Sequence, residues 1–215
     1  ANAARGASLR ILDSRLSRNE QYNAVAIDDA TLLVEDSLLE EGRGAPGVGN
    51  GSGVGAEGAH VTASRCVFSG NQRAGATAAL GGWLRLERCV VRGTLPHPED
   101  LAATLPEDRV ATAGAGVYAW LDGHIDVVDS RVTTNRGLGV GAFGRAAWVN
   151  LLHSVVVDQE GATDLAARGV ESSAGGEVRV DATLLLNNEQ ISLNASSPGS
   201  RLVVVDSMVR STRTH

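Results

Sequence analysis

Residues 60–70, HVTASRCVFSG, and residues 83–93, WLRLERCVVRG, share one pattern of apolar, variable and small positions. Two apolar residues flank a variable one. A small residue lies three positions after the second apolar residue, and a third apolar residue lies two positions after the small one. The pattern returns at residues 124–134, HIDVVDSRVTT, and occurs eight times along the chain. Such self-similarity is typical of a repeat architecture, so this unit decides the fold.

The eight units align on three apolar columns and one column of small residues. The small residues are Ser14, Ser37, Cys66, Cys89, Ser130, Ser154, Thr183 and Ser207. Five positions earlier lie Leu9, Leu32, Val61, Leu84, Ile125, Val149, Val178 and Leu202. Three positions earlier lie Ile11, Val34, Ala63, Leu86, Val127, Leu151, Val180 and Val204. Two positions later lie Leu16, Leu39, Phe68, Val91, Val132, Val156, Leu185 and Val209. No charged residue interrupts the apolar columns, which indicates that they face a core.

A further short alternation runs between the units. We assign to it Val25 with Ile27, Val54 with Ala56, Ala76 with Ala78, Val117 with Ala119, Val140 with Ala142, and Ile191 with Leu193. Period-2 alternation in short pieces bounded by Gly, Asn and Asp indicates strands and excludes a helical solenoid. Three short strands cannot close their own sheet, so successive coils are expected to stack about 4.8 Å apart around a continuous core.

This pattern resembles the right-handed parallel β-helix repeat, the pectin-lyase-like superfamily that includes pectin and pectate lyases, polygalacturonases, phage tailspikes and many bacterial surface proteins. The resemblance covers almost the whole chain. It implies an all-β solenoid of about eight coils of three short strands, and it leaves the chemistry open. It also implies an extracellular or cell-surface bacterial location.

The ends and corners of the repeat give further expectations. Neither end resembles a cap, so we predict that residues 1–215 form a single β-helix segment of a longer protein, able to associate end to end or as an oligomer. Corner residues Asn19, Asn71, Asn135 and Asn188 suit tight turns, because Asn tolerates the left-handed conformation and bonds neighbouring backbone. The other units carry insertions at 42–53, 94–113 and 158–168, predicted to form a wall of loops along one edge, where function often resides.

Charge and hydropathy narrow the classes of partner. The net charge is −6, and all 19 basic residues are Arg without a basic tract, which argues against nucleic acid as a partner. No run approaches the ~18 apolar residues of a membrane span, so no membrane insertion is expected.

The sharpest outward feature is a column of four successive rings, His60, Trp83, His124 and Trp148. Two residues further along the same face come Arg85, Asp126 and Asn150. Ring faces flanked by a guanidinium, a carboxylate and an amide suit a sugar chain, whose faces are apolar and whose edges carry hydroxyls. We therefore predict a non-catalytic, polysaccharide-binding face made of these seven residues. The structural alternative is that the rings only cover a corner or pack beneath the loops.

Two other functions stay open. A polysaccharide lyase or glycoside hydrolase would need converging carboxylates, with Ca²⁺ in the lyase case. The Asp28-Asp29 pair lies at a turn without the accompanying motifs of polygalacturonases. A second candidate cluster lies in coil 5, but strand alternation divides its members between the strand and the corner. Its members are Asp122, His124, Asp126, Asp129 and Arg131. We predict no catalytic residue, no metal site and no cofactor. The third possibility is a structural stalk or adhesin repeat.

Three smaller features complete the candidates. His97 could bind a metal with Glu99 and Asp100, but one His in a loop is weak evidence, and we expect a solvated loop there. Asp36 and Arg65 could pair between coils. Cys66 and Cys89 replace Ser in adjacent coils within disulfide range; they are either two reduced core residues or a bonded pair in an oxidising compartment.

Overall fold

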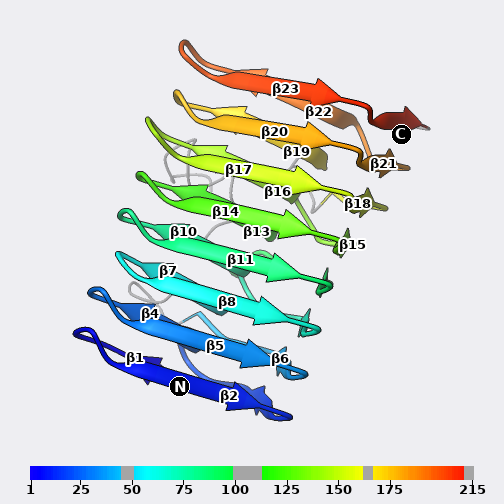
Figure 1. Ribbon diagram of the computed structural model, residues 1–215. Coiled ribbons are helices and arrows are strands. Elements are labelled where there is room, and N and C mark those ends of the chain that lie inside the picture. The colour runs from blue at the N-terminus through cyan, green and yellow to red at the C-terminus, as the bar shows by residue number, and fades with distance from the viewer. Residues whose placement is uncertain (45–50, 99–112, 162–166, 211–215) are drawn as a thin grey trace.

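The computed structural model describes residues 1–44, 51–98, 113–161 and 167–210, and most of the predicted insertions 42–53, 94–113 and 158–168 lies outside these ranges. The described chain forms a right-handed parallel β-helix of eight coils, stacked from the N-terminus to the C-terminus (Figure 1). Each coil contributes one strand to each of three eight-stranded sheets, here called sheets A, B and C. The predicted fold is therefore confirmed. In the described ranges no helix is long and apolar enough to span a membrane.

The three sheets follow one another around every coil. Sheet A contains β1 (Asn2–Ala3), β4 (Tyr22–Ile27), β7 (Ser52–Glu57), β10 (Ala74–Ala79), β13 (Ala115–Trp120), β16 (Leu138–Phe143), β19 (Arg168–Ser173) and β22 (Ile191–Ser196). Sheet B contains β2 (Ser8–Leu12), β5 (Thr31–Glu35), β8 (His60–Ser64), β11 (Trp83–Glu87), β14 (His124–Val128), β17 (Trp148–Leu152), β20 (Glu177–Asp181) and β23 (Arg201–Val205). Sheet C contains β3 (Arg15–Ser17), β6 (Leu38–Glu40), β9 (Val67–Ser69), β12 (Val90–Arg92), β15 (Arg131–Thr133), β18 (Val155–Val157), β21 (Leu184–Leu186) and β24 (Met208–Arg210).

The core is one continuous apolar cluster that runs through all eight coils. The three predicted columns pair in register from coil to coil, as Leu84 does with Ile125 in sheet B and Phe68 with Val91 in sheet C. These side chains are buried except in the two end coils of the described chain, where Val204 and Val209 are each 41% exposed because no described coil lies above them. Burial of aliphatic side chains on all three sheets stabilises the stack.

The predicted third strand occurs in every coil to which it was assigned, as β4, β7, β10, β13, β16 and β22. The inward residues assigned to it are correct in coils 3 to 6 and wrong in coil 2, and in coil 8 Leu193 is correct and Ile191 is wrong. In coil 2 the core residues are Ala24 and Ala26, which pair with Val54 and Ala56, whereas Val25 and Ile27 are only partly buried. In coil 8 Leu193 pairs with the core residue Val170, and Ile191 is 37% exposed.

A bend in sheet A explains the shifted phase. Two successive residues near the start of each strand from β4 onward face the core. Inward and outward positions counted from before this point are therefore shifted by one residue after it. Glycine occupies the first of the two positions in five coils: Gly53, Gly75, Gly116, Gly139 and Gly169. A Cβ on Gly75 would lie 2.2 Å from Cγ1 of Val91, so this close approach requires glycine. In coil 2 the position is Asn23, whose side chain turns into the interior.

A ladder of buried amides follows the corner between sheets C and A. Asn71, Asn135 and Asn188 lie at corners, as predicted, and are completely buried; Gln159 continues the ladder. Their side chains bond main-chain groups and one another, as Asn135 Nδ2 donates to Gln159 Oε1 at 3.0 Å. The left-handed residue is the one before each amide, for example Thr134 (φ 54°). The conformational reason given for Asn was thus wrong, and satisfaction of buried backbone groups explains the residue.

Candidate functional site

The four predicted rings lie in one column on the outer face of sheet B. His60, Trp83, His124 and Trp148 are the first residues of β8, β11, β14 and β17 and pair in register across coils 3 to 6. We call this column the ring ladder. Its two His residues are exposed and its two Trp residues are half-buried. Side chains alternate across a strand, so the inward neighbours Leu84 and Ile125 fix the outward direction of the rings.

The rings contact each other in pairs. The centroids of His60 and Trp83 lie 5.8 Å apart with an interplanar angle of 70°, and those of His124 and Trp148 lie 5.7 Å apart at 90°. Both are edge-to-face contacts, an arrangement that aromatic quadrupoles favour over a flat stack. Each Trp is thereby positioned by a His of the preceding coil.

The polar column beside the ring ladder holds Arg85, Asp126 and Asn150, which also pair in register. The Trp83 Nε1–H donates a hydrogen bond to Asp126 Oδ2 at 3.2 Å, and Asn150 Nδ2 donates to Asp126 Oδ1 at 3.4 Å. Asn150 Oδ1 is buried and has no hydrogen-bond partner in the described part of the chain. Asp126 therefore joins the polar column to the ring ladder.

Arg85 is directed away from this group. Its guanidinium donates to Glu87 Oε2 within the same strand, with Nε at 3.4 Å and an NH2 group at 3.5 Å. All seven predicted residues thus lie on one face, but Arg85 contacts its own strand's carboxylate and not Asp126.

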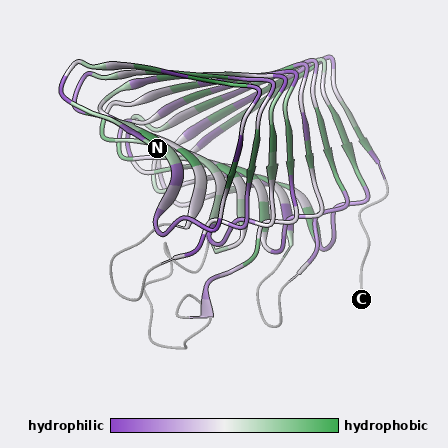
Figure 2. Ribbon diagram, turned by 90° about the horizontal axis from the view of Figure 1, so that it is seen from below, coloured by the Kyte–Doolittle hydropathy of each residue, from purple (hydrophilic) through white to green (hydrophobic). Residues whose placement is uncertain are grey.

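The described residues that flank the three predicted insertions lie away from this face. They lie at the corner between sheets C and A, where Glu20 pairs with Arg43, Gln72 with Leu95 and Arg136 with Glu160. Figure 2 shows the stacked coils from below, coloured by hydropathy. The common corner is as expected from the sequence. Sheet B does not border the corner between sheets C and A. The ring ladder, which lies on sheet B, is therefore separated from these flanking residues.

A buried carboxylate on the outer face of sheet A was not predicted from the sequence. Glu171 is 2% exposed and is the one acidic residue among the buried polar residues described. Arg168 forms an ion pair with it, and Asn194 Nδ2 and Ser196 Oγ donate to its Oε1 at 3.0 and 3.1 Å. The charge is therefore compensated. The alternation around the inward Val170 indicates that Glu171 faces outward, and an outward carboxylate is expected to be solvated. No sequence pattern therefore predicted its burial.

The other predicted candidates are separated as the alternation indicated. Asp122 lies in the turn between sheets A and B with φ 60°, and Asp28 and Asp29 occupy the equivalent turn of coil 2. Asp129 lies at the corner between sheets B and C, 3.8 Å from His153 Nδ1. His97 is 7% exposed, and Glu99 and Asp100 lie outside the described residues. No group of three metal-ligating side chains occurs in the described ranges.

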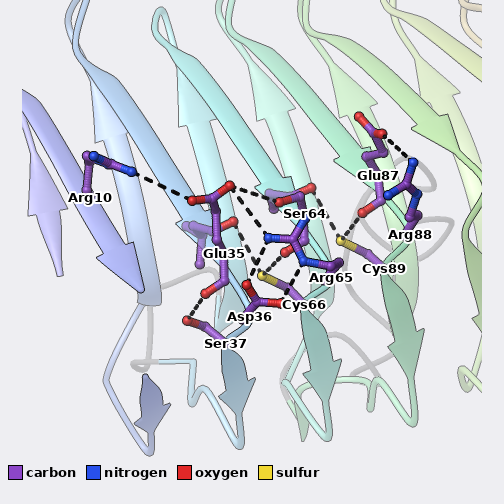
Figure 3. A network of polar contacts seen from close by, with 12 residues as sticks. Arg10, Glu35, Asp36, Ser37, Ser64, Arg65, Cys66, Glu87, Arg88 and Cys89 are labelled. Carbon is purple, nitrogen blue, oxygen red and sulfur yellow. Dashed lines mark hydrogen bonds and ion pairs between the residues drawn. The ribbon is translucent and has the colours of Figure 1, made fainter. Parts of the chain in front are cut away.

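A shallow hollow of about 540 Å³ lies at the corner between sheets B and C in coils 1 to 3. It is lined by Asp13, Ser14, Arg15, Asp36, Ser37, Leu38, Arg65 and Val67. The Arg65 guanidinium closes one side by a two-pronged pair with Asp36, from Nε to Oδ1 at 2.7 Å and from an NH2 group to Oδ2 at 2.8 Å (Figure 3). The hydrogen bond from Arg65 lowers the pKa of Asp36. The predicted pairing between coils is confirmed, and these charges compensate each other.

The comparisons with known proteins add little to this geometry. No family model matches the chain. No curated protein matches it either. Among solved structures, a GH136 lacto-N-biosidase from Eubacterium ramulus aligns at 12% identity over 91% of this chain and 43% of that chain, with a TM-score of 0.30. The chain thus spans less than half the length of that structure, and a similarity this small does not extend to function.

Proposed function

We propose that this chain is a non-catalytic β-helix segment of a secreted or cell-surface bacterial protein, and that it binds a polysaccharide along the ring ladder of sheet B. The observation that carries the proposal is the unbroken column of His60, Trp83, His124 and Trp148 on four successive coils. Aromatic rings bind the apolar faces of sugars, and partly exposed rings in a row suit a chain of them.

The spacing of the ring ladder supports an extended ligand. Trp83 and Trp148 are two coils apart, about 9.6 Å at the strand spacing of parallel sheets. This is comparable to the length of a disaccharide unit, so equivalent sugars of a chain running along the coil axis would meet equivalent rings.

The polar column orients the ring ladder through Asp126. Asn150 Oδ1 has no partner in the described chain, and it lies beside the Asp126 carboxylate that orients Trp83. Both oxygens of Asp126 accept hydrogen bonds from side chains of the same face. This arrangement favours orientation of a binding surface over acid–base chemistry.

The proposal is tested by retention on a glycan array and on neutral and acidic polysaccharides. The double variant Trp83→Ala with Trp148→Ala should keep the β-sheet circular dichroism and lose retention. Trp120→Ala is the matched control, because this 43% exposed ring on the outer face of sheet A lies outside the ring ladder. Equal loss in the control would move the site away from sheet B.

A second assay separates binding from catalysis. The retained polysaccharide is incubated with the protein, with and without Ca²⁺, and new reducing or unsaturated ends are measured. Retention without new ends supports a binding segment, whereas cleavage would make the chain a lyase or hydrolase. Absence of both would favour a structural stalk.

A further inference from the structure

A ladder of small polar side chains follows the corner between sheets B and C. Each hydroxyl donates to the carbonyl two residues earlier, as Ser130 Oγ does to Val128 at 2.7 Å and Ser154 Oγ to Leu152 at 2.8 Å. From coil 2 onward these hydroxyls also accept a backbone N–H of the preceding coil, as Ser154 Oγ does from Ser130 at 3.1 Å. Serine therefore satisfies two backbone groups at this corner in coils 2, 5, 6 and 8.

Cys66 in coil 3 and Cys89 in coil 4 interrupt this ladder on neighbouring rungs. Their thiols donate to the same type of carbonyl at longer distances, Cys66 to Ser64 at 3.2 Å and Cys89 to Glu87 at 3.4 Å. Both residues are 1% exposed and unbonded (Figure 3). A thiol is the weaker donor and acceptor, so sulfur at two adjacent rungs is not explained by hydrogen bonding.

The stacking places the two residues at cross-linking distance. The backbone N–H of Val90 donates to the carbonyl of Cys66 at 2.9 Å, and the following residues Val67 and Val90 pair in register. Neighbouring parallel strands are about 4.8 Å apart, within the Cα separation that a disulfide spans. The neighbouring Cys89 side chain lowers the pKa of Cys66, while the neighbouring Cys66 side chain and burial raise the pKa of Cys89.

We propose that Cys66 and Cys89 are a modification site at which a small-molecule disulfide closes an intrachain bond between coils 3 and 4. The Cys66 thiolate attacks one sulfur of the oxidant and expels its other half as a thiolate. The Cys89 thiolate then attacks the Cys66 sulfur of this mixed disulfide and expels the second half. The pair loses two electrons and two protons, and the oxidant is reduced to two thiols.

The bond would tie together the two coils that carry the first half of the ring ladder. It closes a loop of about 23 residues in the unfolded chain, which removes conformational entropy from the unfolded state. Oxidation is therefore expected to raise the melting temperature by several degrees.

To test this, the native protein is equilibrated with glutathione disulfide and glutathione. Because burial slows access to the sulfurs, the protein is also refolded in the same buffer. We expect that thiol titration after denaturation finds neither thiol, and that the mass falls by two hydrogen atoms. A peptide joining Cys66 to Cys89 should appear after digestion. Cys66→Ser and Cys89→Ser are matched controls, because serine is the usual residue of the column; each should melt like the reduced protein and gain no stability on oxidation. Thiols that stay free after refolding in oxidant, or only mixed and intermolecular disulfides, would overturn the proposal.

Discussion

The indole N–H of Trp83 in coil 4 is hydrogen-bonded to the carboxylate of Asp126 in coil 5, with 3.2 Å between Nε1 and Oδ2. The bond runs diagonally across sheet B, from the ring ladder to the polar column. It shows that the two outward columns form one connected surface. The orientation of a half-buried ring thus depends on a residue 43 positions away in the sequence.

Asp126→Ala should therefore weaken polysaccharide retention without removing a ring. Trp83 loses its acceptor and Asn150 loses its bond, so the ring becomes free to rotate, and the free energy of unfolding should fall by about 1 kcal/mol. Urea unfolding and retention on the array measure the two effects. Glu177→Ala, which removes a carboxylate from the same face in coil 7, is the control. Retention equal to that of the parent would show that the orientation of Trp83 is unimportant for binding.

Val127→Asp should disrupt the stack. Val127 is completely buried in the core column of coil 5, and an unpaired carboxylate there should cost more than about 4 kcal/mol of unfolding free energy. Its neighbour Val128 faces outward and is half-buried, so Val128→Asp should change stability by less than about 1 kcal/mol. Thermal melting followed by circular dichroism distinguishes the two. Similar melting of both variants would mean that the register of β14 is wrong.

The Arg65–Asp36 pair should make a small contribution to stability that depends on pH. In the folded protein, the hydrogen bond from Arg65 lowers the pKa of Asp36 below its ordinary value of 3.8. The contribution is therefore present above the ordinary pKa and is lost as the pH falls through the lowered value. Asp36→Asn should be slightly less stable than the parent at pH 7, and the difference should shrink below pH about 4. A constant difference down to strong acid would contradict the pairing.

Much of the fold was predictable because a stacked coil imposes a simple rule on the sequence. Residues such as Leu84, Ile125 and Val149 must repeat at the same position in each coil, since each lies over its neighbour in a parallel sheet. The same rule placed the ring ladder in register. The rule failed at Val25, because the bend of sheet A turns Asn23 and Ala24 inward together and no local alternation records a bend.

The sequence by itself determined which side chains share a column, because strand period and coil length follow from the order of apolar residues. Only the tertiary structure decided which neighbours those side chains meet. Arg85 bonds Glu87 and not Asp126, and Glu171 is buried on an outer face that alternation assigned to solvent. Such contacts depend on side-chain rotamers and on packing between coils. Both are set by the folded stack, so they produce no repeating pattern in the sequence.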